Sequence, residues 1–260
     1  MKAIILAAGQ GTRLKKYTKN LPKGMLSFMG KTIIERQIEL YRKCGITKII
    51  VVTGFAAHTI NYPDIVFYHN EDYAQTNMVT SFMKAKEEFD EEIIVSYSDI
   101  LVEEAMLRSM LKVPFDFSVA VDDGWKTYWQ KRYGKIEFDT ESLSIDAYDN
   151  ITELGLENPD LEKIDARYIG LLKFSPKGLA YLEQLFCKAC VEYGDKPWQQ
   201  SGKSVKQAYM TDLLNAIIES GQKVKAVRFQ HGWIEFDTNE DYEKACGWVE
   251  DGSIEDLLHL

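Results

Sequence analysis

The sequence is poor in cysteine and lacks a long apolar run. Four cysteines in 260 residues are too few for a disulfide framework in a chain of this length. No apolar stretch approaches the roughly 18 residues of a membrane-spanning helix, and Met1 leads into an apolar segment rather than a basic leader region. These absences argue against a disulfide-stapled protein and against a membrane partner, and we expect a cytoplasmic location.

The cysteines and histidines also lack the spacing of a metal site. Cys187 and Cys190 form a Cys-x-x-Cys pair, but the residues 179–187 have the apolar spacing of an amphipathic helix. No second pair exists, and the four histidines show no ligand spacing. We therefore predict that the pair belongs to a helix rather than to a zinc or redox centre.

Positive charge is in the minority, because 31 Lys and Arg stand against 40 Asp and Glu, for a net charge of −9. This balance opposes nonspecific binding to nucleic acid. Basic residues are nevertheless concentrated near the amino terminus, where they are Lys2, Arg13, Lys15, Lys16, Lys19, Lys23 and Lys31. The sequence thus predicts a local anion-binding site within an acidic protein.

The amino terminus joins an apolar strand to a loop of small residues. Gly9 and Gly11 allow positive φ angles and bring backbone N–H groups close to a phosphate. Arg13 and Lys23 add positive charge for the same anion. The spacing fits neither Walker A nor the Rossmann fingerprint, which requires a glycine where Leu14 stands. We interpret the segment as a nucleotide-binding loop of another kind.

Apolar, β-branched runs alternate with helical patterns along the chain. The runs lie at 2–6, 48–53, 65–68, 93–97, 117–121, 167–174, 223–229 and 233–237. The helical patterns lie at 33–44, 79–88, 102–111, 176–193, 205–220 and 239–248. A capping box at Thr32 and Glu35 begins the first helix, and Gly45 ends it. Strands that are apolar throughout and alternate with helices predict an α/β fold with a doubly wound, mostly parallel sheet.

No linker or internal repeat interrupts the chain, so we predict a single domain over residues 1–260. Residues 1–121 would form a nucleotide-binding half. The periodicity degrades between 122 and 166, where charged and aromatic residues mix, and we expect a small lobe there over the carboxyl edge of the sheet. Residues 167–260 would complete the sheet and add the carboxyl-terminal helices.

Two aspartates follow predicted strands. Asp99 follows the run at 93–97 by two residues, at the edge where open α/β sheets bind ligands. Asp237 is the last residue of the alternating run at 233–237. Two carboxylates and phosphate oxygens would complete the oxygen shell of Mg²⁺. Each aspartate alone is more often a helix cap or turn residue. Glu235 precedes Asp237 by two residues and so faces the same side.

The motif Leu-Ala-Ala-Gly-x-Gly-Thr-Arg-Leu with a following Pro-Lys resembles the signature of the sugar-phosphate nucleotidyltransferase superfamily, which has a Rossmann-like fold. The segments 73–82, 166–171 and 232–242 are similar to small bacterial cytidylyltransferases that act on phosphocholine, phosphoglutamine or aminoethylphosphonate. The phosphocholine enzymes tend to have paired asparagines where this chain has Asn77 and Met78, and Lys131 and Arg132 suit a carboxylate-bearing acceptor. Both features favour the phosphoglutamine-like branch.

The resemblance implies transfer of CMP from CTP to a small phosphorylated acceptor, with release of pyrophosphate, for the decoration of cell-surface polysaccharide. It places Arg13 and Lys23 on the triphosphate as catalytic residues and Mg²⁺ on Asp99 and Asp237. The nucleotide would contact Leu6, Ala7, Ala8, Gly9, Gly11, Thr12, Gln75, Asn77 and Ser98. The acceptor would contact Trp129, Arg132, Tyr168 and Glu235, in the lobe and beside it.

Several alternatives stay open from sequence alone. The aromatic residues of the lobe, Trp129 among them, could form a box for a cationic head group or the lobe's own core. A sugar-1-phosphate uridylyl- or thymidylyltransferase would need a longer lobe. A glycosyltransferase would not need the Gly-x-Gly-Thr-Arg loop, and a regulatory module without turnover would have no reason to retain opposed buried charges. The acceptor is not determined, and a homodimer is compatible with the sequence.

Overall fold

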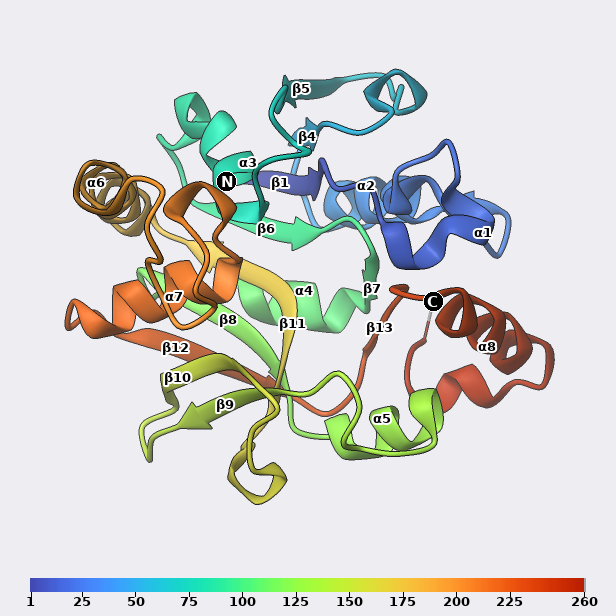
Figure 1. The fold of residues 1–260 in the computed structure, drawn as a ribbon. Helices are drawn as coiled ribbons and strands as arrows, with labels where there is room; N and C mark the ends of the chain where they lie inside the picture. Colours follow the sequence, from blue (N-terminus) through green and yellow to red (C-terminus); the bar gives the residue numbers. More distant parts are fainter. Residues whose placement is uncertain (260) are drawn as a thin grey trace.

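A nine-stranded sheet runs through the computed structural model, which describes residues 1–259 (Figure 1). Its strand order is β5-β4-β1-β6-β11-β8-β12-β10-β9. The strands are β1 (Lys2–Ala7), β4 (Lys48–Thr53), β5 (Ile65–His69), β6 (Ile93–Tyr97), β8 (Phe117–Asp122), β9 (Glu141–Ile145), β10 (Asn150–Glu157), β11 (Arg167–Phe174) and β12 (Val224–Phe229). Two two-stranded sheets pair β2 (Ser27–Phe28) with β3 (Lys31–Thr32) and β7 (Ile100–Val102) with β13 (Trp233–Glu235).

The centre of the sheet is parallel and buried on both faces. All six residues of β1 are buried, and β1 pairs in parallel with both β4 and β6. β11 reverses direction between β6 and β8, and β12 runs parallel to β8. Continuous apolar strands are expected where helices cover both faces of a sheet. The predicted doubly wound, mostly parallel α/β fold is confirmed.

Helices cover the two faces through separate apolar clusters. One cluster includes side chains of α2 (Ile33–Lys43), α4 (Glu104–Leu111), α5 (Trp125–Tyr133) and α8 (Asn239–Glu250). The other includes side chains of α3 (Met78–Lys84), α6 (Pro176–Tyr193) and α7 (Met210–Glu219). A short α1 (Lys15–Thr18) follows the amino-terminal loop. This arrangement leaves the carboxyl ends of the parallel strands free to form a site.

The helix boundaries follow their capping residues. The side chain of Thr32 accepts a hydrogen bond from the backbone N–H of Glu35, and the side chain of Glu35 accepts one from the backbone N–H of Thr32, so α2 begins at Ile33 as predicted. The predicted helix over 205–220 is divided into a 3₁₀ turn and α7, because the backbone N–H of Tyr209 donates to Asp212 and caps the new start. The predicted helix over 79–88 is likewise divided, because α3 ends at Lys84 and a separate 3₁₀ turn follows at Lys86–Glu88.

The segment 122–166, expected to lie over the carboxyl edge, contributes to two different parts of the fold. Its first part is α5, whose aromatic side chains join the apolar cluster under the sheet. Its second part is the hairpin of β9 and β10, and β10 pairs with β12 through Ile151 and Val224. The hairpin therefore extends the central sheet, because the edge of β12 offers free backbone groups to a further strand.

The late strand that carries the second aspartate is shorter than predicted. β13 ends at Glu235 and pairs with β7 outside the main sheet, with Glu235 opposite Ile100. One residue later, the backbone N–H of Phe236 donates to the carbonyl of Asp99 at 2.9 Å. This pairing brings Asp237 to the end of β6.

The structure shows where the cysteines lie and whether any helix could cross a membrane. Cys187 and Cys190 lie in α6 as unpaired thiols, as predicted for a helix. Within residues 1–259, no helix has the length and apolar content needed to cross a membrane. Among the same residues, no group of three or more His, Cys, Asp or Glu side chains is arranged to hold a metal ion.

Candidate functional site

The amino-terminal loop bends because of one glycine conformation. Gly11 has a φ of 62°, and a Cβ there would collide with the side chain of Lys23. The loop then enters a 3₁₀ turn over Thr12–Leu14, which leaves Arg13 exposed while Leu14 is buried. The glycine thus lets the stem of Lys23 cross the loop closely, so that loop and lysine form one surface.

A cavity of about 210 Å³ lies between this loop, the start of α3 and the end of β6. It is lined by the predicted residues Leu6, Ala8, Gly9, Gly11, Thr12, Arg13, Lys23, Asn77, Ser98 and Asp99. Two residues predicted to contact the nucleotide do not line it. Ala7 is buried in the sheet with 1% exposure, and the side chain of Gln75 is exposed to solvent.

Five further residues line the cavity without having been predicted from the sequence, namely Tyr73, Thr76, Met78, Ser81 and Tyr97. Four of them belong to the segment 73–82, whose similarity to cytidylyltransferases is the sequence signal that points to them. Tyr97 is the last residue of β6, immediately before Ser98 and Asp99. Its ring is held against Gly170, where a Cβ would collide with it.

Lys23 lies between the two predicted metal ligands. Its ammonium is 2.9 Å from Oδ2 of Asp99 and also contacts Oδ1 of Asp237. Arg13 donates to the other oxygen of Asp237 at 3.0 Å and to Asp139 at 3.3 Å. Burial acts to raise the pKa of Asp237, but the charges of Lys23 and Arg13 outweigh it and lower the pKa to about 2. Four of the predicted site residues therefore meet at one place.

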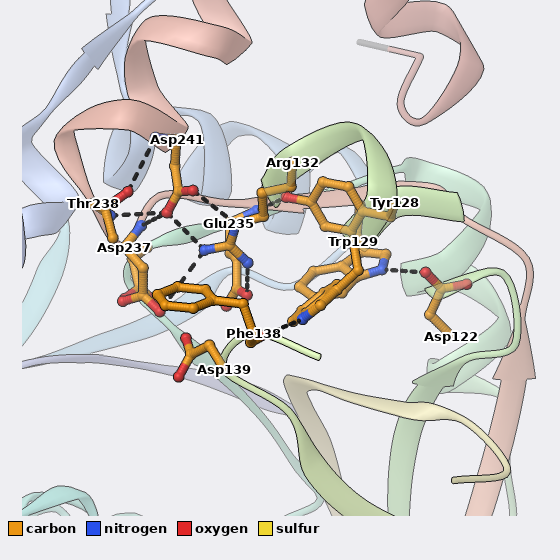
Figure 2. A network of polar contacts seen from close by, with 12 residues as sticks. Asp122, Tyr128, Trp129, Arg132, Phe138, Asp139, Glu235, Asp237, Thr238 and Asp241 are labelled. Atoms are coloured by element: carbon orange, nitrogen blue, oxygen red, sulfur yellow. Dashed lines mark hydrogen bonds and ion pairs between the residues drawn. The ribbon is translucent and has the colours of Figure 1, made fainter. Parts of the chain in front are cut away.

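Arg132 is held in the interior by three carboxylates (Figure 2). It is 1% exposed, and its Nε and Nη2 donate to the two oxygens of Asp241 at 2.9 and 2.7 Å. Its Nη1 contacts Glu235, and Nη2 lies 3.9 Å from Asp237. Asp241 also accepts from the backbone of Thr238 at the start of α8. Arg132 therefore fixes the segment that carries Asp237, and the direct acceptor contact predicted for it stays a prediction.

Trp129 belongs to the core beneath this network. It is 0% exposed, its Nε1 donates to the carbonyl of Phe138 at 2.9 Å, and its ring packs edge-on against Trp125, Tyr128 and Tyr133. The aromatic residues of the lobe could form either a box for a cationic head group or a packed core. The position of Trp129 is that of a residue in a packed core. No face of the Trp129 ring reaches solvent in this structure, and the direct contact with an acceptor stays a prediction.

Tyr168 and Glu235, the other two predicted acceptor residues, remain next to the site. The hydroxyl of Tyr168 donates to that of Tyr97 at 2.9 Å, which links β11 to the cavity wall. Glu235 is 18% exposed and contacts Arg132. Burial raises the pKa of Glu235 to about 7, against the opposing effect of Arg132.

Comparison with known proteins identifies relatives over most of the chain. A family model described as a MobA-like NTP transferase domain matches residues 3–133. The chain is 34% identical over 255 residues to the CTP:phosphoglutamine cytidylyltransferase of Campylobacter jejuni, covering 94% of this chain and 98% of that protein. It is 32% identical over 151 residues to a choline-phosphate cytidylyltransferase of Streptococcus pneumoniae, covering 56% of this chain and 65% of that protein.

Solved structures share the fold. The CTP:phosphocholine cytidylyltransferase from Streptococcus pneumoniae superposes with a TM-score of 0.74 at 22% identity, covering 95% of this chain and 98% of that chain. The inositol-1-phosphate CTP transferase from T. maritima superposes with a TM-score of 0.69 at 18% identity, covering 100% and 98%. At these identities the likeness concerns the arrangement of strands and helices.

Proposed function

The chain is a nucleotidyltransferase of the MobA-like NTP transferase family, and we propose that it transfers CMP from CTP to a small phosphorylated acceptor of the phosphoglutamine or phosphocholine type. One observation carries the reaction type: Lys23, Asp99 and Asp237 converge beside a cavity that the glycine loop lines. The choice of CTP as substrate rests on the similarity to the CTP:phosphoglutamine cytidylyltransferase of Campylobacter jejuni, of which the alignment covers 98%.

The proposed nucleotide site uses the loop from Gly9 to Arg13. Its backbone N–H groups would face phosphate oxygens, and Arg13 and Lys23 would neutralise the triphosphate. In the structure both cations pair with Asp237, and Asp139 and Asp99 add a second carboxylate partner to Arg13 and to Lys23. A triphosphate would compete for the same two cations, so we expect Lys23 to exchange carboxylate for phosphate partners when the nucleotide binds.

The residues present fit a magnesium ion held jointly with the nucleotide. Asp99 and Asp237 direct oxygens to a common point, where Lys23 now supplies the cation. Mg²⁺ is commonly bound by one or two carboxylates together with substrate phosphates and water, so a pair of ligands is sufficient. Bound there, the ion would supply positive charge that offsets the negative charge of the reacting phosphate groups. Movement of Lys23 to the triphosphate would free both carboxylates.

The proposed reaction needs little from protein side chains as acid or base. An acceptor phosphate oxygen attacks the α-phosphorus of CTP, a new P–O bond forms, and the bond to the β-phosphate oxygen breaks to release pyrophosphate. The attacking oxygen is already anionic, so no proton has to be removed. The chain's task is to hold two polyanions close together and to offset their charge, which Arg13 and Lys23 would do from the loop.

The proposed function is tested by pyrophosphate release from CTP and Mg²⁺ with phosphoglutamine, phosphocholine, 2-aminoethylphosphonate and glucose-1-phosphate as acceptors. We expect turnover with one of the first three, and substantially slower turnover when UTP replaces CTP. Turnover only with UTP and glucose-1-phosphate would contradict the proposal. For the variant Lys23→Met, the control for general effects of charge removal is Lys19→Ala, which changes an exposed lysine outside the cavity wall.

A further inference from the structure

Arg167 is a cation at the edge of the candidate site for which the reaction described above has no use. It is the first residue of β11, and its backbone pairs with Asp122 at the end of β8. Because β11 runs antiparallel to β6, its first residue lies toward the carboxyl edge of the parallel strands. The next residue, Tyr168, bonds Tyr97 of the cavity wall. Arg167 is therefore close to the nucleotide site without lining it.

The guanidinium of Arg167 has donors without acceptors. Its Nε and Nη1 are both inaccessible to solvent, and neither finds a hydrogen-bond partner within residues 1–259. Arg132, by contrast, uses Nε, Nη1 and Nη2 on carboxylates. Buried donors are rarely left unpaired, because the lost hydration is not replaced. The unpaired nitrogens of Arg167 thus call for a partner that residues 1–259 do not supply.

Trp129 holds this guanidinium in a defined position. The Cζ of Arg167 lies 4.6 Å from the centroid of the Trp129 ring, and the Cζ of Arg132 lies 5.2 Å from the same ring. The indole is itself fixed by its hydrogen bond to Phe138. Stacking of a planar guanidinium on an aromatic face limits its orientations. Trp129, predicted as an acceptor contact, is therefore a positioning residue for Arg167.

A carboxylate lies near Arg167 without pairing with it. Burial raises the pKa of Glu141, and the charge of Arg167 opposes that shift, so this carboxyl lies within its electrostatic range. Nε and Nη1 of Arg167 make no hydrogen bond to Glu141 within residues 1–259. A fixed cation beside a carboxylate that it does not bind suits a molecule that carries both a negative and a positive group.

We propose that Arg167 binds a carboxylate of the acceptor, so that the enzyme selects a phosphorylated amino acid over acceptors without a carboxylate. This inference rests on the proposed function. The acceptor phosphate must approach Asp99 and Asp237, whereas Arg167 does not line the cavity that Asp99 lines and instead stacks on the ring of Trp129. It therefore serves a second anionic group. Phosphoglutamine carries a carboxylate and an ammonium group, and phosphocholine carries only a quaternary ammonium.

The test compares wild type with Arg167→Gln and Arg167→Lys, using phosphoglutamine and phosphocholine as acceptors. Arg228→Gln is the matched control, because Arg228 also lies on a strand of the sheet but pairs with Asp123 at 3.0 Å. We expect Arg167→Gln to raise the KM for phosphoglutamine about tenfold or more, as for a lost charged hydrogen bond. Its KM for CTP should stay at the wild-type value. Its melting temperature should fall only slightly, because Nε and Nη1 of Arg167 make no hydrogen bond within residues 1–259 and only the stacking on Trp129 is lost. Arg167→Lys should recover part of the affinity.

Three results would overturn the inference. An unchanged KM for phosphoglutamine in Arg167→Gln would remove the carboxylate contact. Equal losses with phosphoglutamine and phosphocholine would assign Arg167 to the shared phosphate. A lower melting temperature with KM values for CTP and acceptor raised alike would make its role structural.

The proposed function fails separately from this inference. Wild-type turnover with phosphocholine but not with phosphoglutamine would leave cytidylyl transfer standing and overturn the role of Arg167. If no acceptor is turned over with CTP, the proposed function fails. Calorimetric titration of phosphoglutamine into wild type and Arg167→Gln then still decides the inference, since equal affinities would contradict it and weaker binding by the variant would support it.

Discussion

Lys23 and Asp99 are joined by an ion pair of 2.9 Å, although 76 positions separate them in the chain. The same ammonium contacts Asp237, which comes 214 positions after the lysine. The amino-terminal loop, the end of β6 and the end of β13 therefore meet at one cation. Each of the three charges is partly buried, with 13 to 19% of its side chain exposed, so removing any one leaves the others with unbalanced charge.

Lys23→Met should abolish most of the activity. We expect kcat/KM to fall about a hundredfold or more, because a cation that opposes charge developing on the triphosphate is lost. The pKa of Asp237 should rise, since Lys23 is one of the charges that lower it. Steady-state kinetics with CTP gives the first quantity, and NMR titration of the aspartate carboxyl gives the second. Wild-type kcat/KM in a folded variant would refute the role of Lys23.

Asp99→Asn and Asp237→Asn test the metal site. We predict that Mg²⁺-dependent turnover falls about a hundredfold in each, as expected when a ligand of a catalytic ion loses its charge. Binding of Mn²⁺ in the presence of CTP, followed by electron paramagnetic resonance, should weaken in parallel. Full wild-type activity in EDTA would rule out the proposed use of a divalent ion.

Arg132→Met should destabilise the fold strongly. It leaves Glu235 and Asp241 without their buried partner, and breaking a buried ion pair on one side typically destabilises by about 3–5 kcal/mol. Arg108→Met is the control, because Arg108 is exposed and pairs with Glu104 on one helix, where such pairs contribute less than about 1 kcal/mol. Urea unfolding of both variants makes the comparison. Equal free energies of unfolding would show that the Arg132 network is dispensable.

Glu88→Gln should make stability less dependent on pH. Burial acts to raise the pKa of Glu88, but Lys2 and Lys48 outweigh it and the pKa lies below the usual 4.5. A lowered pKa in the folded state contributes stability above pH 4.5 that is lost as the pH falls through the folded value. The pKa of Lys2 is raised, so its charge stays constant throughout this acidic range.

The variant should therefore be less stable than wild type at pH 7 by about 1–2 kcal/mol, and the difference should shrink toward pH 3. Urea unfolding at several pH values measures both quantities. Glu87→Gln is the control, because Glu87 is exposed while its neighbour is buried. A difference that stays constant with pH would mean that Glu88 acts through packing rather than charge.

The sequence by itself determined the features that depend on near neighbours. The apolar run before Gly9 predicted a buried strand, and the capping box at Thr32 predicted the start of α2, because each pattern is satisfied within a few residues. The alternation of strands and helices was enough for the doubly wound fold. The resemblance carried by the loop also predicts that Arg13, Lys23, Asp99 and Asp237 belong to one site.

Only the tertiary structure decided how arginines and aromatics divide their roles. Arg132 lies in α5 and Arg167 begins β11, each directly before a tyrosine, and the neighbouring residues do not show which arginine is paired. Contacts with Glu235 and Asp241, more than 100 positions away, satisfy Arg132. Arg167 instead stacks on Trp129, and its Nε and Nη1 have no hydrogen-bond partner in the described part of the chain. Whether a charge is balanced depends on which distant carboxylates the packing brings near. That is a property of the folded chain, and no spacing in the sequence encodes it.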